Sequence, residues 1–283
     1  MEILAKTEPP IANFQRRIPS LDGARGILAL VVMLAHFAAL EGYRQGLPYA
    51  TLSVYGFFFI SGYALTVGWQ GFYVPFLVKR FVRLWPMYAV ALAIGSMLTG
   101  VDTPWHDFFW ASFRNRHTAF PQDPPVWSLY TEVYAGIAMP LIILSARNGW
   151  TAVVATLACL LMSGLQGDFV LAPFFIAGAF AATRIRFDVA ILNGAIAQWL
   201  GKISYSLYLT HALTIVACKH ASPVWWSLVS IPLAFLVAAA FQVLIEGPSI
   251  RFSRAAAKAL IRVERVSRAT LAQADLLKRP SNA

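Results

Sequence analysis

An arginine and a histidine share one face of the first apolar segment of this chain. Arg25 and His36 both lie in the run LDGARGILALVVMLAHFAAL, residues 21–40. They are 11 residues apart, which in a helix makes close to three whole turns and a rise of about 16 Å. That rise is about half of a ~30 Å hydrocarbon core. In a membrane, this spacing predicts an arginine at one mouth of the helix and a titratable imidazole at mid-depth, with Asp22 near them on the same face.

Two further arginines have the spacing of a phosphate-binding pair. Arg80 and Arg83 are three residues apart in FLVKRFVRLWPMYAV and therefore project from neighbouring positions of a helix. They could instead be simple anchors at the cytoplasmic interface. Arg83, however, lies a turn inside the apolar run, where an arginine facing lipid would cost about 2.5 to 3.5 kcal/mol. We therefore expect it to face protein or a hydrated pocket, where two guanidinium forks near Arg25 would make a phosphate site.

A carboxylate lies inside another apolar run. Ser128 and Glu132 are four residues apart in WSLYTEVYAGIAMP, so they share a helix face and the carboxylate lies about one turn below the outer interface. Ionisable groups inside membrane spans are candidates for function. The alternative is that Glu132 only holds a neighbouring helix.

A second histidine falls in the run LGKISYSLYLTHALTIV. Ser204, Tyr208 and His211 follow an i, i+4, i+7 pattern and therefore share one face, with Tyr205 beside Tyr208. A lone histidine on such a face is more often a hydrogen-bonded packing residue than a catalyst, and we expect packing for His211. Glu246 lies at the boundary of the last apolar run, in IEGPSIRF.

A bundle of membrane helices is the scaffold that this composition predicts. The chain of 283 residues is 58% hydrophobic and only 13% charged, which is too apolar for an ordinary soluble domain. The sequence therefore predicts an all-α, polytopic integral membrane helix bundle of about eight transmembrane helices, and we expect Ser61 and Gly62 to pack the second span closely against the first. The segments that approach the ~17 to 25 apolar residues of a span are 24–41, 51–68, 82–99, 128–145, 151–166, 169–183, 203–219 and 224–245.

The net charge of +10 predicts an orientation in the membrane rather than a nucleic-acid partner. If the N-terminus is cytoplasmic and all eight segments span, 19 lysines and arginines fall on the cytoplasmic side. The other side keeps four, Arg44, Arg114, Arg116 and Lys219. This is a strong positive-inside bias, although part of it comes from the long C-terminal tail, where the rule is weaker. Both termini should be cytoplasmic.

The chain is expected to have three parts. Residues 1–19 form a cytoplasmic leader, 20–249 the transmembrane domain and 250–283 a basic tail. In the tail, basic residues recur at spacings of three and four while apolar residues occupy another face, which predicts a cytoplasmic amphipathic helix on anionic lipid. The basic positions are Arg251, Arg254, Lys258, Arg262 and Arg265, and the apolar ones are Phe252, Ala256, Ala259, Val263 and Val266.

The outer loop between Gly100 and Val126 is rich in aromatic residues. Trp105, Phe109 and Trp110 are among them. A belt at the membrane interface explains them without a specific ligand, and we favour that interpretation. The alternative is a rim that binds sugar, because aromatic faces can stack on apolar sugar surfaces.

Six short signatures follow one another between about residues 20 and 250. They are LDGARG followed by His36, FFFISGY, Arg80-x-x-Arg83 with Trp85-Pro86 behind it, WSLYTE, LGKISYSLYLTH and IEGP. Because these signatures occur in this order, the chain resembles the acyltransferase family 3 membrane proteins. Members of that family move acyl groups, commonly acetyl, onto carbohydrates and other hydroxyl-bearing acceptors at the bacterial envelope. They usually have about ten spans, so the resemblance implies that a helix pair between Glu132 and Ser204 is missing or compressed here.

The resemblance implies roles for particular residues. One motif of the family, an arginine followed after ten residues by a histidine, corresponds to Arg25 and His36. Its two-arginine motif corresponds to Arg80 and Arg83. Arg25, Arg80 and Arg83 would bind the phosphates of acyl-CoA, most simply acetyl-CoA. His36 would be the general base on the acceptor hydroxyl, a role that suits an imidazole, and Glu132 would orient the histidine or the acceptor. Supporting candidates are Asp22, Ser128, Tyr205, Tyr208, His211 and Glu246.

The resemblance therefore implies a membrane O-acyltransferase of the bacterial inner membrane. Its partners would be acyl-CoA, a carbohydrate or other hydroxyl acceptor and the lipid bilayer, with no nucleic acid, no metal and no tightly bound cofactor. A transporter or flippase for a lipid-linked or acylated saccharide is the rival hypothesis, since buried ionisable groups fit it equally well. Against it, the sequence has no convincing internal repeat or pair of broken helices. A catalytically silent membrane scaffold is a third hypothesis, favoured by the shortened helix set.

Overall fold

The regular structure of the described residues is entirely helical. The structure, a computed structural model, describes residues 18–104, 108, 124–164, 167–222 and 224–277. Because these residues contain helices and no strand, the all-α prediction is confirmed. The described α-helices are α1 (Pro19–Leu40), α2 (Leu47–Val67), α3 (Tyr73–Thr99), α5 (Trp127–Ile137), α6 (Met139–Ser145), α7 (Gly149–Ser163), α8 (Ala172–Ala182), α9 (Ala195–Ala221), α10 (Trp226–Phe241) and α11 (Gly247–Leu277).

Four of the described helices are long and apolar enough to cross a membrane. They are α1, α2, α3 and the continuous stretch Trp226–Arg268. α5 and α6 qualify together as a fifth, although they are bent by 70° at their junction. The prediction of eight spans is therefore not confirmed. α7 and α8, with 15 and 11 residues, reach only about 22 and 17 Å of a ~30 Å core, and α9 carries too many polar side chains.

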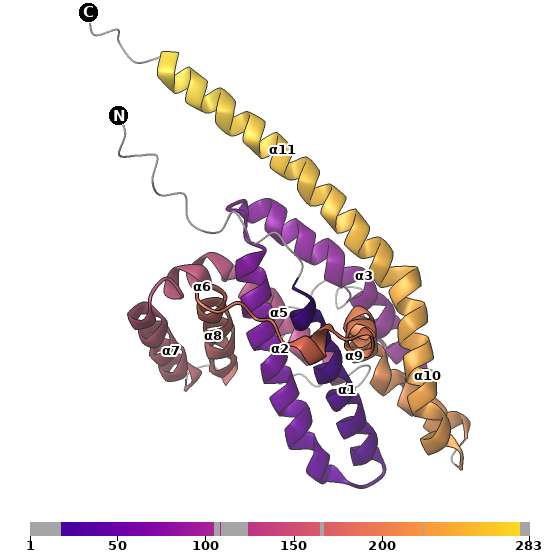
Figure 1. The fold of residues 1–283 in the computed structure, drawn as a ribbon. Coiled ribbons are helices and arrows are strands. Elements are labelled where there is room, and N and C mark those ends of the chain that lie inside the picture. The colour runs from indigo at the N-terminus through magenta and orange to yellow at the C-terminus, as the bar shows by residue number, and fades with distance from the viewer. Residues whose placement is uncertain (1–17, 105–107, 109–123, 165–166, 223, 278–283) are drawn as a thin grey trace, which may run out of the picture.

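α9 lies between α1 and α10 and also contacts α3 (Figure 1). Two glycines allow the backbones of α1 and α9 to approach closely. A Cβ added to Gly26 would collide with the backbone of Gly201, and a Cβ added to Gly201 would collide with the backbone of Asp22. The glycines of the LDGARG and LGKIS signatures therefore bring the Arg25 face of α1 against α9.

A second close helix contact joins α2 to α8. A Cβ on Gly62 would collide with the backbone of Phe175, and a Cβ on Gly178 would collide with that of Phe59. The expected close contact at Gly62 is present, but the prediction that its partner is the first helix is wrong. α2 contacts α1 as well, but the close approach of backbones is to α8.

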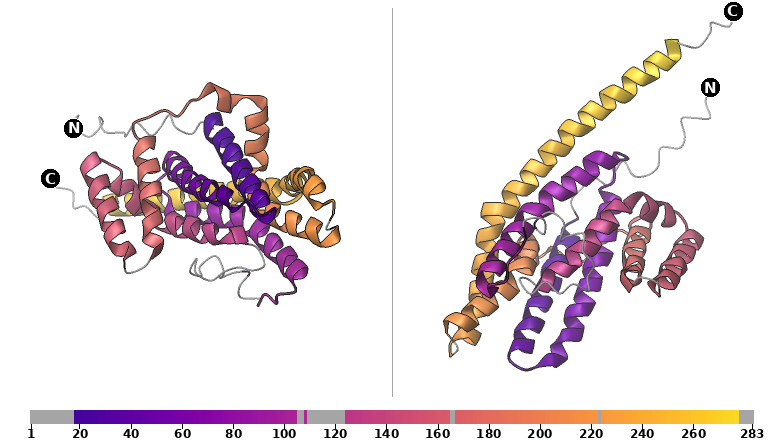
Figure 2. Two further views of the ribbon diagram at one scale, coloured as in Figure 1. Left: turned by 90° about the horizontal axis from the view of Figure 1, so that it is seen from below. Right: turned by 180° about the vertical axis from the view of Figure 1, so that it is seen from behind.

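α10 continues into α11 through a π-helical turn at Gln242–Glu246. α11 packs along α3 and then extends beyond the rest of the bundle (Figure 1). α7 and α8 lie at the opposite edge of the molecule from α10 (Figure 2). Phe252, Val263 and Val266 on α11 are more than half exposed. Its expected contact with anionic lipid stays a prediction.

Candidate active site

A cavity of about 340 Å³ lies between α1, α2, α3, α5, α9 and α11. That volume is within the range of small-molecule sites. The sequence analysis gave eleven residues a catalytic, donor-binding or supporting role. Nine of them line this cavity, and His36 and His211 do not. Basic side chains outnumber acidic ones by six to three, so the cavity favours an anion. The basic residues are Arg25, Lys79, Arg80, Arg83, Arg254 and Lys258, and the acidic residues are Asp22, Glu132 and Glu246.

Arg80 is held in place by α5. Its Nη2 lies 3.1 Å from Oε1 of Glu132 and donates to the backbone oxygen of Glu132 at 3.2 Å. Gly136, one turn further along α5, makes room for the guanidinium, because a Cβ there would lie 2.8 Å from the Nε of Arg80. Ser61 donates to the same Oε1 at 3.5 Å. Among the described residues, the Glu132 carboxylate thus contacts Arg80 and Ser61 and not His36.

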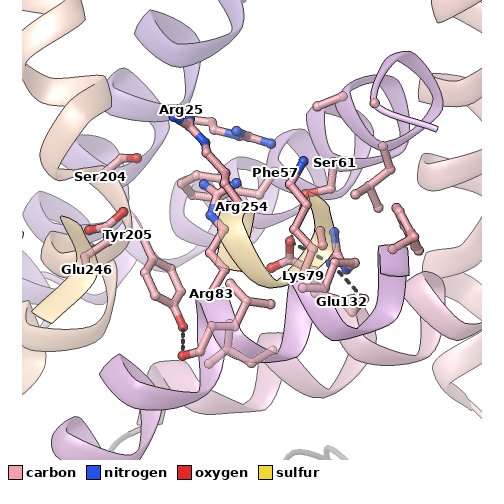
Figure 3. A pocket seen from close by; sticks show the side chains of 18 of the residues that line it. Arg25, Phe57, Ser61, Lys79, Arg83, Glu132, Ser204, Tyr205, Glu246 and Arg254 are labelled. Atoms are coloured by element: carbon pink, nitrogen blue, oxygen red, sulfur yellow. Dashed lines mark hydrogen bonds and ion pairs between the residues drawn. The ribbon is translucent and has the colours of Figure 1, made fainter. Parts of the chain in front are cut away.

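Three other guanidinium groups point into the same space. Arg25, Arg83 and Arg254 come from α1, α3 and α11 and converge there (Figure 3). Arg25 lies within electrostatic reach of Arg83, Arg80, Asp22 and Glu132. Within the part of the chain that the structure describes, Arg25, Arg83 and Arg254 have no hydrogen-bond or ion-pair partner. Their N–H groups are therefore available to a ligand.

Hydrogen bonds fix α9 beside these arginines. The Tyr205 hydroxyl donates to the backbone oxygen of Leu84 at 2.8 Å, which ties α9 to α3 next to Arg83 (Figure 3). The Ser206 hydroxyl donates to Oε2 of Glu246 at 2.6 Å, and Glu246 is only 4% exposed. Ser204 donates to the oxygen of Gly201 in its own helix at 2.9 Å. The wall of the cavity is thus braced on both sides of Tyr205.

Ser128 and Tyr208 line the cavity on the side of the histidines. Their hydroxyl oxygens are 2.8 Å apart and both side chains are buried. Phe57 packs edge-on against Tyr208, with ring centroids 5.5 Å apart. The ring of Tyr208 contacts His211, with a centroid distance of 6.1 Å. Tyr208 therefore stands between the cavity and the histidines.

His36 and His211 are hydrogen-bonded to each other. Nδ1 of His36 lies 3.1 Å from Nε2 of His211, and Nδ1 of His211 lies 3.1 Å from the carbonyl oxygen of Leu207. A carbonyl only accepts, so a neutral His211 carries its proton on Nδ1 and its Nε2 is an acceptor. His36 therefore donates from Nδ1, and the lone pair on its Nε2 is left for another partner.

His36 lies toward the C-terminal end of α1. The helix begins at Pro19 and ends at Leu40, so His36 is four residues, or about 6 Å, from its last residue. The helix ends alone do not place the membrane, so the mid-depth position of His36 stays a prediction. Arg25 and His36 lie toward opposite ends of α1.

Three basic residues of the cavity were not predicted from the sequence as part of the site. Lys79 was not among the predicted site residues, and Arg254 and Lys258 were predicted on a lipid-facing helix, yet all three line the cavity. The spacing of four between Arg254 and Lys258 placed them on one face, but nothing local showed that this face turns toward α3. Most of the aromatic outer loop, including Trp105, lies outside the described residues.

The family model described as an acyltransferase domain, that of acyltransferase family 3, matches residues 18–190, which is more than half of the chain. The matched region contains Arg25, His36, Arg80 and Glu132 and ends before α9. No curated protein and no solved structure matches the chain. The chain belongs to the acyltransferase family 3 that its sequence signatures indicated.

Proposed function

We propose that this membrane acyltransferase moves an acyl group, commonly acetyl in its family, from cytoplasmic acyl-CoA to a hydroxyl of a cell-envelope or exported carbohydrate. The observation that supports the donor most is the cavity in which Arg25 and Arg83 lack a partner among the described residues. Guanidinium groups bind phosphate through paired, charge-assisted hydrogen bonds. Coenzyme A carries a pyrophosphate and a ribose phosphate, which suit such a cluster.

In this proposal Arg80 has a different task from the other arginines. Glu132 neutralises part of its charge and fixes its guanidinium. Its remaining N–H groups can still contact a phosphate, in a set orientation. The six lysines and arginines that line the cavity support a cytoplasmic opening for it, because basic residues gather on the cytoplasmic side of membrane proteins.

His36 serves as the general base. The bond from His36 Nδ1 to His211 leaves Nε2 able to take a proton. As the acceptor oxygen attacks the thioester carbon, Nε2 takes the hydroxyl proton. The tetrahedral intermediate then collapses, the C–S bond breaks, and the coenzyme A thiolate leaves and takes the proton from His36. Such a base contributes about 10² to 10⁴ in rate.

The two substrates approach from different ends of α1. The donor enters at Arg25, and its thioester reaches the side of the cavity at Ser128 and Tyr208. The acceptor approaches His36, which is partly exposed and lies near the other end of the helix. The reaction therefore requires Tyr208, which separates the cavity from the histidine pair, to move aside or to border the reacting atoms.

The test is transfer of label by the purified full-length protein. We would supply acetyl-CoA labelled in the acetyl group with a panel of mono- and oligosaccharides, and measure labelled ester. The enzyme forms ester, and His36→Gln at equal abundance lowers the rate at least about 100-fold. A transporter or a silent scaffold forms no ester. Full activity of His36→Gln would remove the histidine from the mechanism.

A further inference from the structure

α11 lies outside the region that the family model matches, yet it contributes to the cavity. The match ends at residue 190 and α11 begins at Gly247. Arg254, Lys258 and Ile261 line the cavity and are spaced so that they share one face of a helix. We propose that Arg254 and Lys258 complete the phosphate-binding site for the nucleotide part of the donor, an inference that rests on the proposed function.

The packing of α11 fixes the part of the helix that carries these two residues, whose side chains line the cavity and are exposed. Ser253 and Ala257, beside them on the helix, are only 1% and 5% exposed. At its start, the helix is fixed through Glu246, which accepts from Ser206 of α9. Arg254 and Lys258 are therefore carried by a docked helix and not by a free tail.

A second contact fixes α11 beyond the cavity. The guanidinium groups of Arg265 and Arg268 lie over the ring of Phe72, at 5.5 and 4.9 Å from its centroid, which is within the range of a cation–π interaction. Phe72 itself lines the cavity. Arg268 also pairs with Glu264 at 2.6 Å. The helix is thus held on both sides of Arg254 and Lys258.

The charges in this corner are not balanced. Lys79 lies within electrostatic reach of Arg83 and Arg254. Within the described part of the chain, none of these three, nor Lys258, has an ion-pair or hydrogen-bond partner. Like charges held together repel one another, and an anion bound among them removes that repulsion. A ligand with more than one phosphate fits cations supplied by both α3 and α11.

Coenzyme A meets this requirement because its phosphates are separate groups. Arg25 and Arg83 could bind one of them while Arg254 and Lys258 bind another. Dephospho-coenzyme A lacks the ribose 3′-phosphate, so it shows whether the α11 pair recognises that group or the pyrophosphate. In either case α11 sets the affinity for the donor and leaves the chemical step unchanged.

The experiment measures equilibrium binding of coenzyme A and dephospho-coenzyme A to the purified full-length protein in zwitterionic nanodiscs. The test variant is Arg254→Gln with Lys258→Gln. The control is Arg251→Gln with Arg262→Gln, which removes the same charge from positions of the same helix that are exposed like the test pair but do not line the cavity. We expect at least tenfold weaker binding of coenzyme A in the test variant and less than twofold change in the control.

Three outcomes would decide against the inference. Equal loss in both variants would indicate a general effect of charge, and unchanged affinity in the test variant would remove α11 from the donor site. Weaker association with anionic phosphatidylglycerol vesicles, at unchanged affinity for coenzyme A, would assign the pair to lipid. If the unchanged protein binds no coenzyme A, the proposed donor is wrong. This outcome differs from failure of the inference, in which the unchanged protein binds coenzyme A and the test variant binds it equally well.

A folding defect is separated from a binding defect by a further measurement. Size-exclusion profiles and thermal unfolding of both variants are compared with those of the unchanged protein. The single variant Lys258→Arg keeps the charge and the native Arg254. It should therefore retain most of the affinity for coenzyme A that the test variant loses. A test variant that unfolds at the same temperature and binds coenzyme A at least tenfold more weakly supports the inference.

Discussion

His211 should matter through the hydrogen bond that it accepts from His36. Replacing it with asparagine keeps a polar group near the carbonyl of Leu207 but places nothing where Nε2 accepts at 3.1 Å. Glutamine is longer, and its amide oxygen can reach that position. The asparagine variant leaves His36 free to turn or to shift its proton to the other nitrogen, whereas the glutamine variant keeps the acceptor.

The expected loss of rate follows from the misplacement of the His36 imidazole. A catalytic group misplaced by about 1 Å can cost about 100-fold in rate, which is about 2.7 kcal/mol in activation free energy. We therefore expect kcat of His211→Asn to fall about 100-fold and that of His211→Gln to fall less than tenfold. KM for acetyl-CoA should be nearly unchanged in both, because the histidines do not line the donor cavity.

A double-variant cycle measures whether the two histidines act together. His36→Gln removes the base, so adding His211→Asn to it should cost little more, since no imidazole remains to be oriented. Rates of ester formation from labelled acetyl-CoA are compared at equal protein abundance. Equal activity of the asparagine and glutamine variants, or losses that simply multiply, would refute the positioning role.

Three further predictions concern the packing around the cavity. Glu132→Gln leaves the partly buried Arg80 without its counter-charge, so we expect unfolding to become easier by about 1 to 3 kcal/mol, seen as a lower melting temperature in detergent. Gly26→Ala forces α1 and α9 apart and should reduce folded protein sharply, by a penalty of about 1 to 3 kcal/mol, whereas Gly164→Ala, whose added Cβ meets only an atom at 3.5 Å, should be tolerated in the same expression assay. Tyr208→Phe loses the hydrogen bond to Ser128, worth about 1 kcal/mol, and thermal unfolding should show a loss of at least about this size.

The helical class and the family could be predicted because their signals are local. Apolar runs and the spacing of Arg25 and His36, or of Arg80 and Arg83, are readable along the chain. The signatures also contained the glycines that let α1 and α9 meet. These features explain why most of the predicted site residues line one cavity.

Features that depend on contacts between distant segments could not be predicted in this way. The partner of Gly62 is set by where α8 packs, and the place of Arg254 is set by α11 packing along α3. The number of spans depends on helix ends and on the bend between α5 and α6, which hydropathy alone does not show. The contact between His36 and His211 joins residues 175 positions apart, and neither histidine reveals it alone.

The central claim is that the cationic cavity is the donor site, and a structure of the protein determined with coenzyme A bound tests it most directly. We predict phosphate density among Arg25, Arg83 and Arg254, with the thiol end directed toward Ser128 and Tyr208. Coenzyme A bound elsewhere, with this cavity empty or occupied by lipid, would contradict the account.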